Sequence, residues 1–409
     1  MNPLLQLYRY TPRLRNISLA HTASSCMYEE CLLCQMGFLF DMLEKASGQN
    51  CQATNLLKTL ATIPTASRVG ILEEEPASSS TNNSLTSMMQ SLNRFLLDTT
   101  INDIKTSQRP LGPDEAELPQ ALMIKAAKRQ QCMVCHKESR PMGDSVTTDL
   151  VYTHKPPGNK ALPSFAQTVR QSIQVETTTK GWCDKCRRYQ TQHTRKSITK
   201  LPDILTFNCT IGDKAPLAGG GGAASQDYWS TAGWLPDEIG LTLNNKLLNV
   251  WQGEHLKRVA KRSNDQADLR IYELVGFVAE VREEEERRKH MVAFVNVALS
   301  RDGREDEDGD GDGGGEDDGS SDATSGADEP NWHVFNDFLV RPVTRDEALD
   351  FSPKWKMPAV LCYQLKSTRA RRGVREEAAP TVWAPEEREA RKLEQGNVAE
   401  KSAAALSVA

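Results

Sequence analysis

The sequence predicts an α+β fold, because helix-like and strand-like patterns occupy different parts of the chain. Apolar residues recur at helical spacing in the N-terminal part, and short alternating segments typical of strands follow Cys132. Two CxxC units lie within the strand-rich part, at Cys132–Cys135 and Cys183–Cys186. The length of 409 residues and the hydrophobic fraction of 38% fit one large domain or two ordinary ones, diluted by disordered insertions.

Helices are expected along most of the N-terminal part. The expected segments are residues 2–10, 30–45, 51–60 and 85–96. Thr11 and Pro12 are expected to interrupt the first of them. Residues 1–46 are thus expected to hold two helices, 2–10 and 30–45. Residues 73–84 are rich in Glu, Ser and Asn and predict a flexible loop, and residues 105–120 predict a Pro- and acid-rich linker.

The second expected helix carries a CxxC unit of its own. One face of this helix presents Cys31, Cys34, Phe38 and Met42. We expect this stripe to pack in the core, where a free cysteine behaves as a small apolar residue. A metal site that the pair shares with Cys26 or Cys51 is the alternative.

The strand-rich part is expected to form a sheet accompanied by a helix. The expected strands are residues 145–152, 198–211, 271–281, 291–299, 334–343 and 359–365, and the helix is 165–172. Strands 271–281 and 291–299 alternate well enough to pair with each other. The glycine run within residues 214–226 lacks the Lys-Ser/Thr of a phosphate-binding loop, which makes a loop insertion the better interpretation.

Residues 301–330 form an acidic, glycine-rich run with 13 Asp and Glu residues and two Arg. Its Asp308 and Asp310 resemble the start of a calcium loop, but Gly319 stands where such a loop needs a bidentate Glu. We therefore predict a solvated, disordered insertion. Since the net charge of the whole chain is −5, the remainder is mildly basic, which does not indicate strong electrostatic binding of nucleic acid.

The two CxxC units of the strand-rich part are the clearest chemical signal in the sequence. Each tight turn presents two thiolates, so the pair supplies Cys132, Cys135, Cys183 and Cys186 as ligands for a tetrahedral Zn²⁺ site. The 47 residues between the units must form structure of their own. A closed site of four cysteines leaves zinc no open position, and its role is expected to be structural. Four unliganded cysteines on adjacent hairpins are the alternative.

The ten cysteines are expected to be reduced thiols of an intracellular protein. The sequence carries no secretory signal pattern and no apolar run long enough to span a bilayer. No association with a membrane is therefore predicted.

Four stretches together resemble the ubiquitin-specific protease domain, a papain-like α+β fold with thumb, palm and zinc-bearing fingers. They are residues 2–6 (NPLLQ), the two CxxC units, residues 201–205 (LPDIL), and the boxes at 290–294 (HMVAF) and 332–337 (WHVFND). The resemblance implies one ubiquitin-hydrolase-like domain over residues 1–365, and a charged tail over 366–409 that is a loose helix or disordered. Its insertions would be residues 73–84, 105–120, 214–226 and 301–330.

Longer matches resemble a narrower family, the catalytic subunits of the Pan poly(A)-nuclease deadenylation complex. The matching stretches are residues 30–43, 49–55, 181–186, 335–340 and 355–361. In that family the domain lacks the nucleophile and joins a WD-repeat propeller to a two-metal exonuclease. The resemblance implies a non-catalytic scaffold that supports mRNA poly(A)-tail shortening in the cytoplasm, P-bodies included. It also implies a pseudokinase-bearing regulatory subunit as partner and, through it, poly(A)-binding protein and mRNA.

The resemblance places His290 and Asn336 at the histidine and orienting positions of a papain-like triad. The nucleophilic cysteine would fall two residues before Met1, so we expect no protease activity; an exposed strand-end residue is the other interpretation of His290. The 44 residues after Leu365 are too few for the family's exonuclease. Mg²⁺ is therefore expected only in that absent domain, and no deadenylase activity in this chain.

Two other classes of protein stay open at this point. A ubiquitin-specific cysteine protease truncated before its catalytic cysteine would carry the same motifs. A zinc-finger nucleic-acid binder would show a salt-sensitive affinity for RNA. The absence of interleaved aromatic and basic residues in the sequence does not favour the second class.

Overall fold

The computed structural model describes most of the chain between Met1 and Arg369. The described residues are 1–21, 26, 30–46, 49–68, 85–106, 113–153, 162–209, 217–218, 226–244, 246–262, 268–282, 289–300, 331–353 and 355–369. The predicted loop 73–84, the acidic run 301–330 and the tail beyond residue 369 lie outside them. Residues Met1–Ala370 form one unit of mixed helix and sheet.

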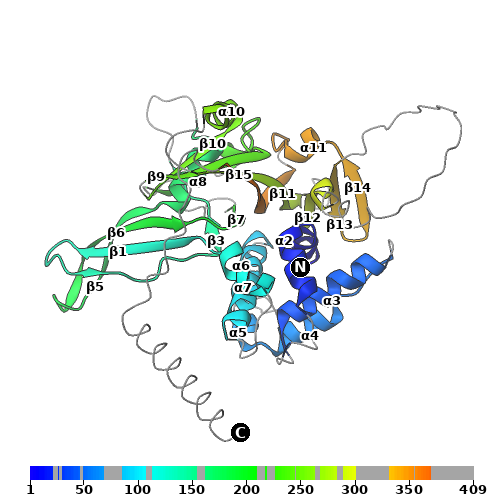
Figure 1. The fold of residues 1–409 in the computed structure, drawn as a ribbon, viewed down its shortest axis with the longest axis horizontal. Coiled ribbons are helices and arrows are strands. Elements are labelled where there is room, and N and C mark those ends of the chain that lie inside the picture. The colour runs from blue at the N-terminus through cyan, green and yellow to red at the C-terminus, as the bar shows by residue number, and fades with distance from the viewer. Residues whose placement is uncertain are drawn as a thin grey trace, which may run out of the picture. The chain divides into compact units, whose positions relative to one another are not determined.

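Helices fill the N-terminal part of this unit (Figure 1). They are α1 (Asn2–Arg9), α2 (Pro12–Ala20), α3 (Leu32–Lys45), α4 (Thr54–Thr62), α5 (Pro64–Arg68), α6 (Leu85–Thr106) and α7 (Pro113–Leu122). Proline begins α2, α5 and α7, because its fixed φ suits the first helical position and its missing N–H needs no partner there. Buried leucines and methionines of these helices form one apolar cluster against the central sheet.

In the described part of the chain the central sheet has nine strands, of which β11 (Leu269–Arg282) and β15 (Lys356–Arg369) are the longest. The others are β3 (Thr147–Asp149), β7 (Ile204–Asn208), β9 (Glu238–Asn244), β10 (Leu247–Gln252), β12 (Lys289–Asn296), β13 (Trp332–Asn336) and β14 (Leu339–Val343). The order is β14-β13-β12-β11-β15-β7-β3, with β9 pairing β11 and β10. Strand β3 runs parallel to β7, whereas β11 pairs antiparallel with β12, β15 and β9.

A second apolar cluster covers the opposite face of the central sheet. The elements on this side include α8 (Phe165–Ile173), α9 (Gln226–Trp229) and α11 (Arg345–Leu349). Alternation along β15 separates the two clusters, because Cys362 belongs to the helical cluster while Leu361 and Tyr363 belong to the second. The remaining described elements are β4 (Tyr152–Thr153), β8 (Leu217–Ala218), α10 (Gly253–Arg262) and a 3₁₀ turn at Val297–Ser300.

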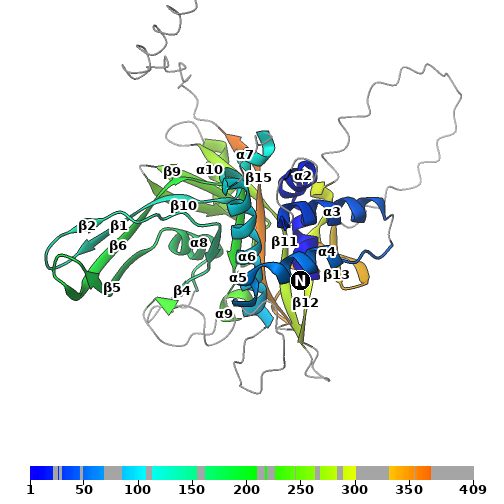
Figure 2. The same ribbon diagram turned by 90° about the horizontal axis from the view of Figure 1, so that it is seen from below.

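Among the described residues, a second sheet of four strands extends away from the central sheet (Figure 2), and we call this sheet the fingers. It contains β1 (Lys125–Cys132), β2 (Glu138–Ser139), β5 (Glu176–Cys183) and β6 (Arg188–Lys200), in the order β2-β1-β6-β5. The two CxxC units form the turns between β1 and β2 and between β5 and β6. The sheet therefore brings together two turns that lie far apart in the sequence.

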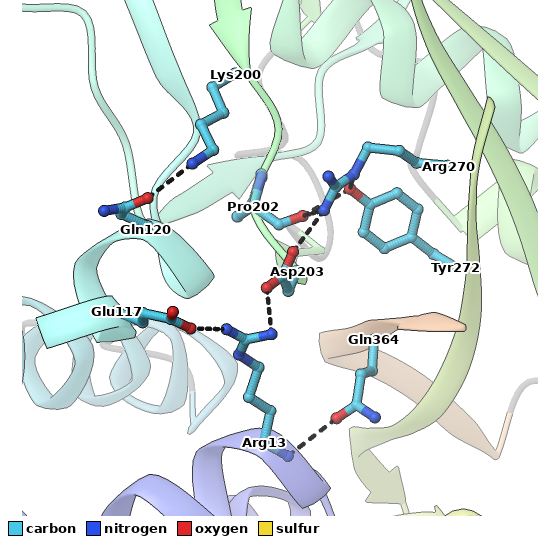
Figure 3. Close-up of polar contacts among 9 residues, drawn as sticks. All are labelled: Arg13, Glu117, Gln120, Lys200, Pro202, Asp203, Arg270, Tyr272 and Gln364. Carbon is cyan, nitrogen blue, oxygen red and sulfur yellow. Dashed lines mark hydrogen bonds and ion pairs between the residues drawn. The ribbon is translucent and has the colours of Figure 1, made fainter. Parts of the chain in front are cut away.

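An ionic network at Asp203 joins helices to the central sheet (Figure 3). Asp203 immediately precedes β7, and its carboxylate pairs with Arg13 of α2 at 2.6 Å and with Arg270 of β11 at 2.5 Å. Arg13 also pairs with Glu117 of α7 at 2.6 Å. Asp203 thus contacts two elements, α2 and β11, that are remote from it in the sequence.

Most predicted elements are present, but the helical part needs two corrections. The sequence predicts two helices over residues 1–46, whereas three are present: Pro12 ends one helix and begins another, α2, which buries Leu14 and Ile17. The linker predicted over residues 105–120 is wrong over its second half, where α7 forms. Acidic residues after Pro113 favour a helix start, and Leu118 is fully buried.

The stripe of α3 that was predicted to pack in the protein core is buried only at its N-terminal end. Cys31 and Cys34 are buried, but Phe38 and Met42 are 43% and 42% exposed. The core-facing side of α3 instead carries Leu32, Leu33, Met36, Leu39 and Phe40. A period of 3.6 residues allows several stripes on a largely apolar helix, and the sequence alone does not select among them.

Several strand boundaries also differ from the prediction, and the strand expected over residues 334–343 is a hairpin of β13 and β14 with its turn at Asp337 and Phe338. The strand expected over residues 198–211 is divided into β6 and β7, because Pro202 has no N–H to donate to a ladder. Strand β15 continues to Arg369, into the expected tail. Within the insertion expected over 214–226, Leu217–Ala218 forms β8, which pairs with β4; the other residues up to 225 lie outside the described part of the chain.

Candidate functional site

A cleft of about 780 Å³ lies where the start of α1 approaches the end of β13. In a papain-like fold the nucleophile stands at a helix N-terminus, so this is where a protease centre would lie. The cleft is lined by Met1, Asn2 and Leu5 of the α1 region and by Phe335, Asp337, Phe338, Leu339 and Val340 around the β13–β14 turn. Cys51, which precedes α4, lines the same cleft and is half-buried.

The structure places His290 and Asn336 on neighbouring strands, β12 and β13. Ala293 pairs with Phe335 in this ladder, so that Asn336 falls opposite Val292, two residues from His290 on the same face. Neither side chain hydrogen-bonds to another residue that the structure describes, and neither lines the cleft beside α1. The carboxyl group that does line it belongs to Asp337, which has a positive φ of 50°.

The four finger cysteines come together at the tips of the two hairpins. The Sγ atoms of Cys132, Cys135, Cys183 and Cys186 all lie within 4.8 Å of one another, and those of Cys135 and Cys183 are 3.5 Å apart. Each CxxC turn is followed by a residue with positive φ, His136 at 57° and Arg187 at 51°. Both turns therefore bend in the same way, and each directs its two sulfur atoms inward.

The backbone of the first turn favours a thiolate. Backbone N–H groups of Cys135 and Val134 donate to the Cys132 sulfur and lower the pKa of this thiol to about 6. Lys137 and Asp184 link the two turns by an ion pair of 3.6 Å. Soft thiolate donors in a compact group of four fit a tetrahedral Zn²⁺ ion well, so the sequence-predicted ligand set is brought together.

A second cluster of ligand-type side chains lies between α2 and α3. His21, Cys26, Cys31 and Cys34 have ligand atoms within 4.8 Å of one another, and His21 Nε2 is 3.3 Å from Cys31 Sγ. The Cys34 thiol and the Cys34 backbone N–H both donate to the Cys31 sulfur, and the pKa of Cys31 falls to about 4. Of the two partners that the sequence suggests for this CxxC unit, Cys26 belongs to the cluster and Cys51 does not, and His21 was not predicted.

The sequence feature that could have indicated His21 as a ligand is its spacing from the cysteines. His21, Cys26 and Cys31 follow one another at intervals of five residues, and Cys34 completes the CxxC unit. The interval points to a connection between two helices only when α2 is expected before His21. The sequence does not predict α2, because Pro12 was interpreted as the end of a helix.

These features place the chain in a protein family. A family model described as ubiquitin carboxyl-terminal hydrolase matches residues 1–340, and the chain belongs to this family. The fold predicted from the sequence and the resemblance to a ubiquitin-hydrolase-like domain are thereby confirmed.

Curated relatives of the chain include subunits of a deadenylation complex. The chain is 39% identical over 371 residues to the PAN2-PAN3 deadenylation complex catalytic subunit pan2 of Aspergillus terreus, and 38% identical over 372 residues to the corresponding subunit of Coccidioides immitis. Each match covers 90% of this chain. The chain spans only 28% and 27% of the length of these curated relatives.

Solved structures agree with the same assignment. The Neurospora crassa Pan2 catalytic unit, described as protease and nuclease domain, matches with a TM-score of 0.67 and 31% identity, over 89% of this chain and 55% of that chain. The Saccharomyces cerevisiae PAN2 pseudoubiquitin-hydrolase matches with a TM-score of 0.60 over 89% and 82% of the two chains. At 19% identity, the yeast structure supports the fold alone. None of the described helices combines the length and apolar character needed to cross a membrane.

Proposed function

We propose that the chain is the non-catalytic, ubiquitin-hydrolase-like scaffold region of a PAN2-type catalytic subunit, and that it supports shortening of mRNA poly(A) tails. The observation that carries this proposal is the match over 90% of the chain to subunits named for a deadenylation complex. The cleft beside α1 agrees with it, because His290 and Asn336 do not line the place where a thiolate would attack a carbonyl.

The intact protein would supply the chemistry and the partners. The regulatory subunit of the PAN2-PAN3 complex, with its pseudokinase, is the proposed direct partner, and poly(A)-binding protein and mRNA would be reached through it. Mg²⁺ would belong to an exonuclease region, since the two candidate metal clusters found among the described residues contain only Cys and His and no carboxylate. The proposed location is the cytoplasm, P-bodies included.

Zinc is the proposed structural ion of the fingers, held by Cys132, Cys135, Cys183 and Cys186. Strand β5 has exposed side chains along most of its length, so few apolar contacts hold the finger tips together. Metal binding in such a site contributes directly to folding. Cys183→Ser is expected to lose zinc and to melt at a lower temperature than the parent chain, and equal melting of the parent chain with and without a chelator would contradict this role.

The scaffold proposal is tested on the intact subunit, in which this region is combined with its natural neighbours. Deletion of the region is expected to abolish poly(A) shortening, whereas His290→Ala and Asn336→Ala each leave the rate within about twofold of the parent, because neither residue takes part in chemistry. Loss of activity in either point variant, with the fold intact, would overturn the proposal.

The protease alternative is tested separately with a ubiquitin probe that carries a thiol-reactive C-terminus. We expect no covalent adduct with the full chain. Cys51 lines the cleft, so Cys51→Ser provides the matched control. An adduct that forms with the parent chain and disappears in this variant would establish a ubiquitin-directed cysteine protease instead.

A further inference from the structure

We propose that His21, Cys26, Cys31 and Cys34 form a second structural zinc site, which fastens α2 to α3 within the helical layer. The site is independent of the finger cysteines and does not depend on the proposed scaffold function. Its ligand set is one imidazole and three thiolates, a common combination for structural zinc.

The distances within the cluster suit a tetrahedral ion. With Zn–S bonds of about 2.3 Å and a Zn–N bond of about 2.0 Å, ligand atoms on a tetrahedron lie about 3.5–3.8 Å apart. All four ligand atoms lie within 4.8 Å of one another, and the His21 Nε2 to Cys31 Sγ distance is 3.3 Å. Small side-chain rotations are therefore enough to reach coordination geometry.

The burial of the ligands indicates a closed site. His21, Cys31 and Cys34 are 6%, 2% and 4% exposed, and Cys26 is half-buried. Polar contacts offset the loss of solvent of a buried imidazole, and the Cys31 sulfur lies 3.3 Å from His21 Nε2. A metal ion satisfies all four donors at once, and the burial of three of them leaves little room for a substrate, so the role is structural.

The backbone holds three of the ligands at helix ends. His21 is the residue that caps the C-terminus of α2, Cys31 caps the N-terminus of α3, and Cys34 stands in the first turn of α3. The positive end of the α3 dipole favours thiolates at this place. A backbone N–H of Cys34 donates to the Cys31 sulfur, as in the zinc knuckles of the fingers.

Asp103 of α6 completes the surroundings of the cluster. Its carboxylate accepts the backbone N–H of Leu32 and lies near enough to interact electrostatically with His21 and Cys31. A carboxylate beside a ligating histidine is usual in zinc sites, where it helps to orient the imidazole.

Two other states of the same side chains make different predictions. None of the ten cysteines is in a disulfide in this structure, so a bond between two of the three clustered thiols is one alternative. Metal-free thiols that hydrogen-bond to His21 are the other. Both leave the finger cysteines as the one zinc-type cluster among the described residues.

Zinc content of the full chain, purified under reducing conditions without chelator, separates these states. We expect two zinc ions per chain, falling to one in Cys31→Ser, to one in Cys183→Ser, and to none in the double variant. Cys51→Ser is the control, because this cysteine belongs to neither cluster, and it should retain two. One zinc in the parent chain that disappears in Cys183→Ser alone would overturn the proposal, as would two zinc ions in Cys31→Ser.

A second measurement covers the case in which Cys31→Ser does not fold. After replacement of zinc by Co²⁺ in the chain that carries Cys183→Ser, only the helical site should give a thiolate-to-cobalt absorption band. His21→Cys in this background should keep the band and shift the visible transitions to lower energy, because a fourth thiolate replaces the imidazole. Absence of the band, or a spectrum unchanged by His21→Cys, would contradict the assignment.

Discussion

Lys356 is a buried ammonium group at the start of β15. Its Nζ donates to the carbonyl oxygens of Ala348, at 2.8 Å, and of Glu347, at the C-terminal end of α11. The same nitrogen lies 4.7 Å from the centre of the Phe294 ring and 5.2 Å from that of Phe351. The carbonyl groups and the rings offset part of the loss of hydration. Burial nevertheless dominates and lowers the pKa of Lys356 from 10.5 to about 8.

This pKa predicts how stability changes at alkaline pH. Between about pH 8 and pH 10.5 the unfolded chain holds the Lys356 proton while the folded chain releases it, so the free energy of unfolding gains a contribution that rises with pH. The rise, on the order of 2–3 kcal/mol, should be absent in Lys356→Met. The measurement is the difference in unfolding free energy between parent and variant from pH 7.5 to pH 10.

Lys58→Met provides the control, since Lys58 is exposed on α4. Its difference from the parent chain should stay flat over the same pH range. A flat difference for Lys356→Met as well would mean that the carbonyl and ring contacts fully compensate for burial.

At the scale of elements, the contact between α2 and α3 depends on Gly37. A Cβ atom at this position would lie 2.2 Å from the backbone oxygen of Ser18. Glycine in the middle of a helix is unfavourable by about 1 kcal/mol relative to alanine, so its presence here is explained by the close approach of the two backbones.

Gly37→Ala is therefore expected to lower the free energy of unfolding by about 1–3 kcal/mol, opposite in sign to the usual effect in a helix. Denaturant unfolding measures the change. Gly181→Ala is the matched control, because the atoms nearest to its Cβ would belong to the Gln192 side chain, the closest at 3.1 Å, and this side chain can move. A Gly37→Ala variant as stable as the parent would show that α2 and α3 separate without cost.

The elements differ in how far the sequence could predict them. Strands β11 and β12 are predictable and pair as expected, because each is a long apolar segment with its own turn signals. The finger cysteines are predictable as a group, because CxxC spacing itself brings two sulfur atoms together. Helix α2 is not, because Pro12 carries the same signal whether it ends a helix or begins one. Because α2 was not expected, the regular spacing of His21, Cys26 and Cys31 was not interpreted as a cluster between two helices.

In the molecule as a whole, Asp203 connects helix α2 to strand β11, which lie far apart in the sequence. Its side chain is 22% exposed, and its carboxylate pairs with two guanidinium groups, those of Arg13 and Arg270. The sequence alone predicts a strand at LPDIL but not this role, because the partners come from α2 and β11 and are set by the tertiary fold. Two cations on one carboxylate also explain why the position suits Asp rather than an amide.

Asp203→Asn is accordingly expected to destabilise the whole unit by about 1–3 kcal/mol, because two half-buried arginines lose their shared counter-charge. The control is Asp237→Asn, whose pair with Arg345 at 2.8 Å is about half exposed on both sides and should contribute less than about 1 kcal/mol. The measurement is unfolding followed by both far-UV circular dichroism of the helices and tryptophan fluorescence.

Transitions that coincide, with both midpoints lowered in Asp203→Asn, would show that the network couples the N-terminal helices to the central sheet. A loss confined to the helix signal would show instead that the two layers unfold separately and that Asp203 stabilises only one of them.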